Sequence, residues 1–195
     1  MITLEQVVGW SALLAAVATV IGAATLALFF QRGEPWGTRN DIAAIVLMVA
    51  TIPVAVLIGA IEGDHFGITA AIVAGVGIVG MLACAGFQLA LVARLRTYEQ
   101  LLARTLGAGV IVGVWYVLAG VLALLGGGLD GPLPLLAIAS GLGFVAVGFG
   151  FAAGAQAHPL AIGGGLLVLI ASTAFLALLG FRLVSGGIVV PSWSA

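Results

Sequence analysis

The residues best suited to chemistry are few, and the densest group of them is Glu62, Asp64 and His65. Two carboxylates beside an imidazole can bind a cation or respond to pH. A metal site needs three or four converging ligands, and the sequence shows no obvious further partner for this group except Asp130. A solvated turn is the simpler interpretation, and a weak metal site is its alternative.

Ser140 and His158 are of the types that serve as nucleophile and base in serine hydrolases. Those groups must lie within hydrogen-bond reach, whereas about 18 residues of helix, or about 27 Å, separate this pair. An intramembrane enzyme is therefore the weakest of the functional hypotheses, and we expect no catalytic site.

Cofactor and nucleic-acid binding find no support in the sequence. Gly75, Gly77 and Gly80 match the letters of a dinucleotide-binding fingerprint, but they lie inside an apolar stretch and not at a turn from strand to helix. Cys84 is the only cysteine, which excludes a disulfide within the chain and a thiolate zinc site. The chain has no lysine, and its six arginines form no basic patch.

The composition indicates an integral membrane protein. Hydrophobic residues make up 63% of the chain and charged residues 7%, against about 45–50% and about 25% in soluble domains. About 20 apolar residues cross a bilayer as a helix. We therefore predict an all-α bundle of six transmembrane helices forming one domain over residues 1–195. The predicted spans are 8–30, 42–61, 68–92, 105–125, 133–154 and 160–181.

The arginines predict how the spans are oriented. Five of them fall in the first and third connectors, and only Arg182 falls on the other side. By the positive-inside rule those connectors are cytoplasmic, which places both termini outside the cytoplasm. We expect the membrane to be a plasma membrane. Arg32 and Arg39 are candidates for binding an anionic lipid headgroup, while Asn40 or Asp41 can cap the second helix.

Thirty glycines predict close packing between the helices. Small residues recur every four positions, as at Gly109 and Gly113 or at Ala146, Gly150 and Gly154. Such rows let helix backbones approach one another in lipid, where no hydrophobic force drives helices together. Packing within the chain is the simpler interpretation, and an interface with another copy or another membrane subunit is the alternative.

No charged residue or histidine lies in the central part of any predicted span, which argues against ion-coupled transport and voltage sensing. Pro53 should kink the second helix and free a carbonyl near residue 49. Neutral polar and aromatic side chains at similar depth then define a candidate cavity, with ordinary hydrogen bonds between helices as the simpler alternative. The candidate residues are Thr51, Pro53, Gln88, Trp115, Tyr116, Ser140 and Thr173.

Three functional hypotheses follow. The leading one is a non-catalytic bundle that binds a lipid or another hydrophobic ligand, or serves as a membrane subunit of a complex. The alternative is a passive channel or transporter for a small neutral solute, with a path lined by Thr51, Tyr116, Ser140 and Thr173. A membrane enzyme comes third, because no acid–base pair shares a depth in the membrane.

Overall fold

The computed structural model describes residues 3–154 and 157–188, and within these ranges it contains helices and no strand. Six helical segments are long and apolar enough to cross a membrane, so the chain is a multi-pass membrane protein and the expected six-helix bundle is confirmed. Each predicted span lies within one segment. The helices are α1 (Leu4–Arg32), α2 (Trp36–Phe66), α3 (Ile68–Val92), α4 (Tyr98–Gly126), α5 (Leu133–Gly154), α6 (Pro159–Leu167) and α7 (Thr173–Val184).

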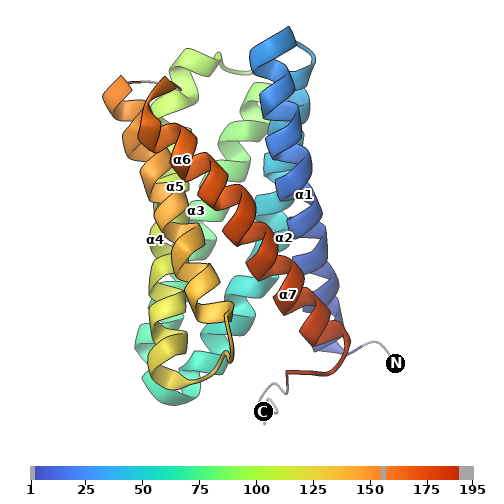
Figure 1. The fold of residues 1–195 in the computed structure, drawn as a ribbon, viewed down its shortest axis with the longest axis vertical. Coiled ribbons are helices and arrows are strands. Elements are labelled where there is room, and N and C mark those ends of the chain that lie inside the picture. The colour runs from blue at the N-terminus through green and yellow to red at the C-terminus, as the bar shows by residue number, and fades with distance from the viewer. Residues whose placement is uncertain (1–2, 155–156, 189–195) are drawn as a thin grey trace.

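The sixth span is divided by a π-helical turn, η2 (Val168–Ser172), which separates α6 from α7. Consecutive spans run in opposite directions and pack side by side, and α7 returns to pack against α1 (Figure 1). The sixth span slants, so that α6 contacts α5 at one end of the bundle while α7 contacts α1 at the other. Among the described residues, no Cα atom of α1 lies within 8 Å of one in α6, although α1 does contact η2.

The two ends of the bundle differ in charge. Arg32, Arg39, Arg94, Arg96 and Arg104 lie at or near one end, called here the arginine end. The first turn of α1 and the last turn of α7 lie at the opposite end (Figure 1). The terminal residues 1–2 and 189–195 are outside the described ranges.

Side chains next to the connectors fix where helices begin. The Thr3 hydroxyl accepts from the Gln6 N–H at the start of α1, and the Gln6 side chain accepts from the Thr3 N–H in return. At the start of α2, the Glu34 carboxylate accepts from the Thr38 N–H (3.3 Å) and hydroxyl (3.0 Å). Since α2 begins at Trp36, neither Asn40 nor Asp41 caps it, contrary to the sequence-based expectation.

Glycines bring the helix backbones into direct contact, as the sequence predicts. A methyl group added at Gly113 of α4 would lie 2.8 Å from the carbonyl oxygen of Gly141 in α5. The corresponding distance is 2.7 Å from Gly164 of α6 to the Gly143 oxygen, and 2.7 Å from Gly180 of α7 to the Gly9 oxygen. These contacts hold α5 against α4 and α6, and α7 against α1.

An aromatic layer fills the middle of the bundle. Tyr116 of α4 stacks on Phe144 of α5, with ring centroids 6.0 Å apart, and meets Phe175 of α7 edge-on at 5.7 Å. Trp115 packs beside Tyr116 at 4.4 Å and lies against Gly77 of α3. Trp115, Tyr116 and Phe175 are all buried, so the layer is solidly packed.

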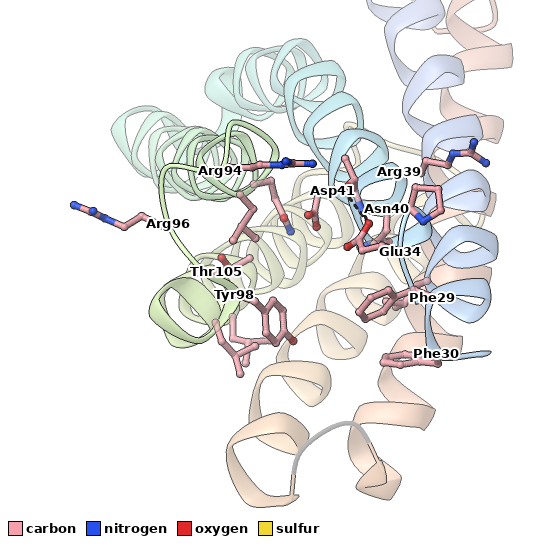
Figure 2. Close-up of a pocket in the computed structure, with 18 of the residues that line it drawn as sticks. Phe29, Phe30, Glu34, Arg39, Asn40, Asp41, Arg94, Arg96, Tyr98 and Thr105 are labelled. Carbon is pink, nitrogen blue, oxygen red and sulfur yellow. Dashed lines mark hydrogen bonds between the residues drawn. The ribbon is translucent and has the colours of Figure 1, made fainter. Parts of the chain in front are cut away.

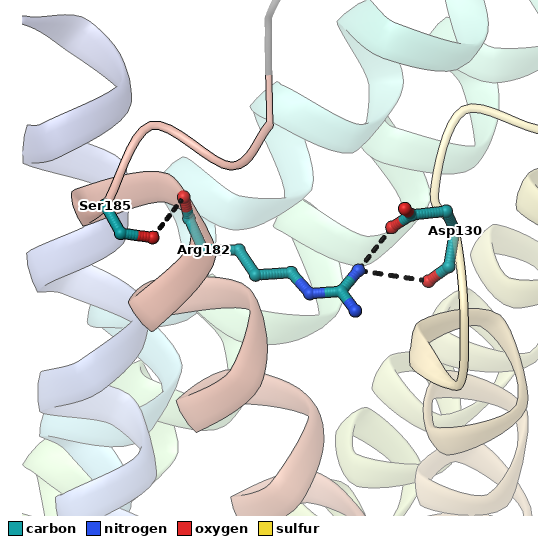
Figure 3. A network of polar contacts seen from close by, with 3 residues as sticks. All are labelled: Asp130, Arg182 and Ser185. Atoms are coloured by element: carbon teal, nitrogen blue, oxygen red, sulfur yellow. Dashed lines mark hydrogen bonds and ion pairs between the residues drawn. The ribbon is translucent and has the colours of Figure 1, made fainter.

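At the end opposite the arginine end, one ion pair joins the last helix to the connector between α4 and α5. The Arg182 guanidinium pairs with the Asp130 carboxylate and also donates to the Asp130 carbonyl at 3.4 Å (Figure 3). The Ser185 hydroxyl donates to the Arg182 carbonyl. Asp130 is largely exposed, and exposed pairs contribute at most about 1 kcal/mol.

We expect Gly113→Ala to lower stability by about 1–3 kcal/mol, because the added methyl overpacks the contact between α4 and α5. Gly107→Ala is the matched control on the same helix, since a methyl there meets nothing within 4 Å. The control should be unchanged or slightly more stable, as alanine favours helix over glycine. Thermal unfolding in detergent micelles measures both, and equal melting temperatures would contradict the packing at Gly113.

Candidate functional site

Two joined cavities occupy the arginine end of the bundle. A chamber of about 790 Å³, called the polar chamber, lies between the ends of α1, α2, α3 and α4. A second chamber of about 280 Å³, called the apolar chamber, lies deeper among the helices. The two adjoin, because five residues line both: Leu26, Asn40, Gln88, Thr105 and Leu106.

Arg94 supplies the cation that faces the polar chamber. Figure 2 shows its side chain extending across the chamber toward Asp41, whereas Arg39 and Arg96 extend away from it. The Arg39 guanidinium instead lies over the Trp36 ring, 4.4 Å from its centroid. Of the three arginines that border the chamber, only Arg94 thus faces its interior.

The position of Arg94 follows from the way α3 ends. The Leu95 N–H donates to the Ala90 carbonyl (2.9 Å) and the Arg94 N–H to the Leu91 carbonyl (2.9 Å), as in the turn that commonly closes a helix. That turn needs a left-handed residue, usually glycine, and here Arg94 takes the place with φ of 56°. A left-handed non-glycine residue costs about 1–2 kcal/mol. Strain of this kind is often found at functional sites.

Two carboxylates face Arg94 from the start of α2. Asp41 is half-buried in the second turn of the helix, and Glu34 lies close to it. Within residues 3–154 and 157–188 the one ion pair is that of Arg182 with Asp130, so Asp41 and Arg94 have no ion-pair partner there. The chamber therefore presents opposite charges that face one another without touching.

Polar atoms without partners collect where the two chambers join. The side-chain oxygens of Gln88 and Thr105 are buried and accept no hydrogen bond from the described part of the chain. An unpartnered buried polar group costs about 1–3 kcal/mol. Because native proteins satisfy nearly all such groups, we expect these two to find their partner in a molecule that enters the chamber.

The apolar chamber is lined by small and hydrophobic residues from most of the spans. Gly22 of α1, Gly109 of α4 and Val168 of η2 all border it. Gly22 of α1 and Gly165 of α6 both line this chamber, and no Cα atom of α1 lies within 8 Å of one in α6. The π-helical turn lies in the wall of the chamber, and such turns are frequent at functional sites.

Most residues of the sequence-predicted cavity lie elsewhere. Thr51, Trp115, Tyr116 and Ser140 are buried in or beside the aromatic layer. The Thr51 and Ser140 hydroxyls donate to carbonyls of their own helices, each at 2.7 Å. Gln88 alone of the predicted set borders the two chambers.

Pro53 and Thr173 also lie away from the chambers. Helix α2 continues through the half-buried Pro53, and the Ser11 hydroxyl of α1 donates to the Ala50 carbonyl at 2.8 Å, next to the carbonyl that the sequence predicts to be free. Thr173 begins α7, and its buried hydroxyl has no partner among the described residues.

The two arginines predicted to bind a headgroup both lie at the arginine end. Of the two predicted headgroup residues, Arg39 borders the polar chamber and Arg32 is exposed in the last turn of α1. Sequence reasoning did not single out Arg94, Asp41 or Thr105 for a site. The grouping of five arginines beside Asp41 was the available signal for them.

The predicted polar group at the other end of the bundle does not converge. Glu62 is 1% exposed and its carboxylate lies against Gly126 and Gly128, whereas Asp64 and His65 are exposed. Both Glu62 oxygens lack a hydrogen-bond partner in the described ranges. No three potential metal-ligating side chains come together among the described residues.

We expect Glu62→Gln to raise the thermal stability, because it removes a buried carboxylate that has no donor while keeping the shape of the side chain. Asp64→Asn, two residues away and exposed, is the matched control and should change stability by no more than about 0.5 kcal/mol. Melting temperatures in detergent at neutral pH test the pair. A marked loss of stability in Glu62→Gln would mean that the carboxylate has a partner.

Comparisons of the chain with protein-family models, with curated proteins and with solved structures gave no match. No relative therefore assigns a role to any residue of the two chambers. What they can do chemically follows from their own arrangement, in which a charged compartment adjoins a hydrophobic one.

Proposed function

We propose that the protein binds an amphiphile of the membrane, with its headgroup in the polar chamber and its hydrocarbon chain in the apolar chamber. The observation that carries this proposal is that a charged chamber and an apolar chamber adjoin at Gln88 and Thr105. The volume of the polar chamber lies within the range of about 300–1,000 Å³ that is usual for ligand sites.

The wider spacing between the backbones of α1 and α6, with no two Cα atoms within 8 Å, supports access from the bilayer. A hydrocarbon chain can pass between these helices at the level of Gly22 and Gly165, while the headgroup stays at the membrane surface.

The passive-channel alternative has less support. Its expected path runs through Thr51, Tyr116 and Ser140, which are packed in the interior with exposed fractions of 2%, 2% and 0%. Next to the layer, the void beside Trp115 and Glu62 measures about 10 Å³, room for no more than about one water molecule. The chambers end at this layer.

The charge distribution supports an orientation for the ligand. By the positive-inside rule, we propose that the arginine end faces the cytoplasm and that both termini lie outside, in a plasma membrane. The polar chamber then lies at the level of the cytoplasmic headgroups. The ligand would be drawn from that leaflet.

We expect Gly109→Leu to reduce the amount of co-purified amphiphile about tenfold or more. A side chain at Gly109 meets nothing within 4 Å and projects into the apolar chamber, where it takes the place of the ligand chain. The control is Gly107→Leu, which lies two residues earlier on α4, on another face of the helix and outside both chambers. Native mass spectrometry of the proteins in mild detergent counts the bound molecules, and equal occupancy in the two variants would refute the proposal.

The orientation can be tested by cysteine labelling in a Cys84→Ala background. We expect Asp64→Cys to react with a membrane-impermeant maleimide in intact cells, and Arg96→Cys to react only after permeabilisation. Both positions are exposed and lie at opposite ends of the bundle. The reverse labelling pattern would place the arginine end outside.

A further inference from the structure

We propose that the headgroup bound in the polar chamber is zwitterionic, carrying a phosphate that pairs with Arg94 and an ammonium that pairs with Asp41. This inference rests on the proposed amphiphile binding and specifies the ligand of the same site. The supporting observation is that Arg94 lies on one side of the chamber while Asp41 and Glu34 lie on the other.

Arg94 provides the anion-binding side. A guanidinium can form two parallel hydrogen bonds to a phosphate, which gives both strength and orientation. The left-handed turn at the end of α3 directs this side chain across the chamber, and no carboxylate among the described residues forms an ion pair with it (Figure 2). A phosphate beside Arg94 would supply the missing partner.

Asp41 provides the cation-binding side. Its carboxylate is half-buried on the facing wall of the chamber and has no cationic partner within the described ranges. Glu34 adds a second negative charge nearby, although its carboxylate is already engaged with Thr38. An ammonium between these groups would be attracted by both carboxylates.

A purely anionic headgroup fits this arrangement less well. It would gain the contact with Arg94 but would also face Asp41 and Glu34, and like charges at close range repel. Arg39 and Arg96 offset little of that repulsion inside the chamber, because both extend away from it (Figure 2). The interior is therefore matched to a headgroup that has both signs of charge.

The division between head and chain favours a phospholipid over a soluble zwitterion. Beyond Gln88 and Thr105 the cavity is lined mainly by apolar residues such as Met48, Phe144 and Leu169. A lipid chain there fills the chamber and makes van der Waals contacts with its walls. A free aminoalkyl phosphate would leave this chamber empty.

The test compares lipids that differ only in the headgroup. The purified full-length protein in mild detergent is offered equal amounts of dioleoyl phosphatidylethanolamine and dioleoyl phosphatidylglycerol, and bound lipid is counted by native mass spectrometry. We expect the zwitterionic lipid to be retained about tenfold over the anionic one. Soluble phosphoethanolamine, added as a competitor, should displace little of it.

Charge variants assign the preference to residues. Asp41→Asn should lower the ratio of zwitterionic to anionic lipid about fivefold, since it removes the carboxylate that attracts the ammonium. Arg94→Gln should reduce binding of both lipids. Arg104→Gln, which removes an exposed arginine of α4 that lines neither chamber, is the matched control and should leave the ratio unchanged. Melting temperatures of the lipid-free variants show whether each still folds.

The outcomes separate this inference from the proposed function. Equal or greater retention of the anionic lipid by the unaltered protein, or an unchanged ratio in Asp41→Asn, would overturn the zwitterionic headgroup while leaving amphiphile binding intact. Displacement by phosphoethanolamine alone would overturn the phospholipid assignment. If neither lipid bound, and Gly109→Leu behaved as Gly107→Leu does, the proposed function itself would be wrong.

Discussion

Direct contact between helix backbones at glycine is the interaction on which the rest of this structure depends. Lipid provides no hydrophobic force to press apolar helices together, so close van der Waals contact has to do so. Gly164 holds α6 against α5, and Gly180 holds α7 against α1. Because these two contacts lie on different neighbours, the sixth span has to cross the bundle at a slant. The apolar chamber is the space left where that span departs from α1.

Much of the fold was predictable from the sequence because the bilayer imposes the length of a span and forces its backbone to be helical. The chambers were not predictable, because glycines that look alike in sequence have opposite roles. Gly113 is pressed against α5, while Gly109, one turn earlier, faces open space. Small-residue spacing identifies both equally, and only the tilt of the neighbouring helices distinguishes them. Asp41 was predicted as a possible helix cap, but α2 begins five residues earlier, at Trp36, so Asp41 lies within the helix and borders the polar chamber.

The buried polar groups are distributed unevenly along the membrane normal. In the middle of the bundle, the Thr51 and Ser140 hydroxyls donate to carbonyls of their own helices. Among the described residues, unpartnered buried oxygens occur at Gln88 and Thr105 toward the arginine end, at Glu62 toward the other end, and at Ser172 and Thr173 in the middle of the sixth span. Of these groups, Gln88 and Thr105 are the ones that border the two chambers.

The π-helical turn between α6 and α7 has a consequence for how this bundle can change over time. Each residue advances an α-helix by about 100°, so one residue more or fewer rotates everything that follows by that angle. The wide turn at Val168–Ser172 sets the angular phase at which Gly164 meets α5 and Gly180 meets α1 within one continuous span. A single-codon deletion there would turn α7 away from α1 without altering any residue of either contact. The sixth span is therefore sensitive to small insertions and deletions in a way that its composition, rich in interchangeable apolar residues, does not reveal.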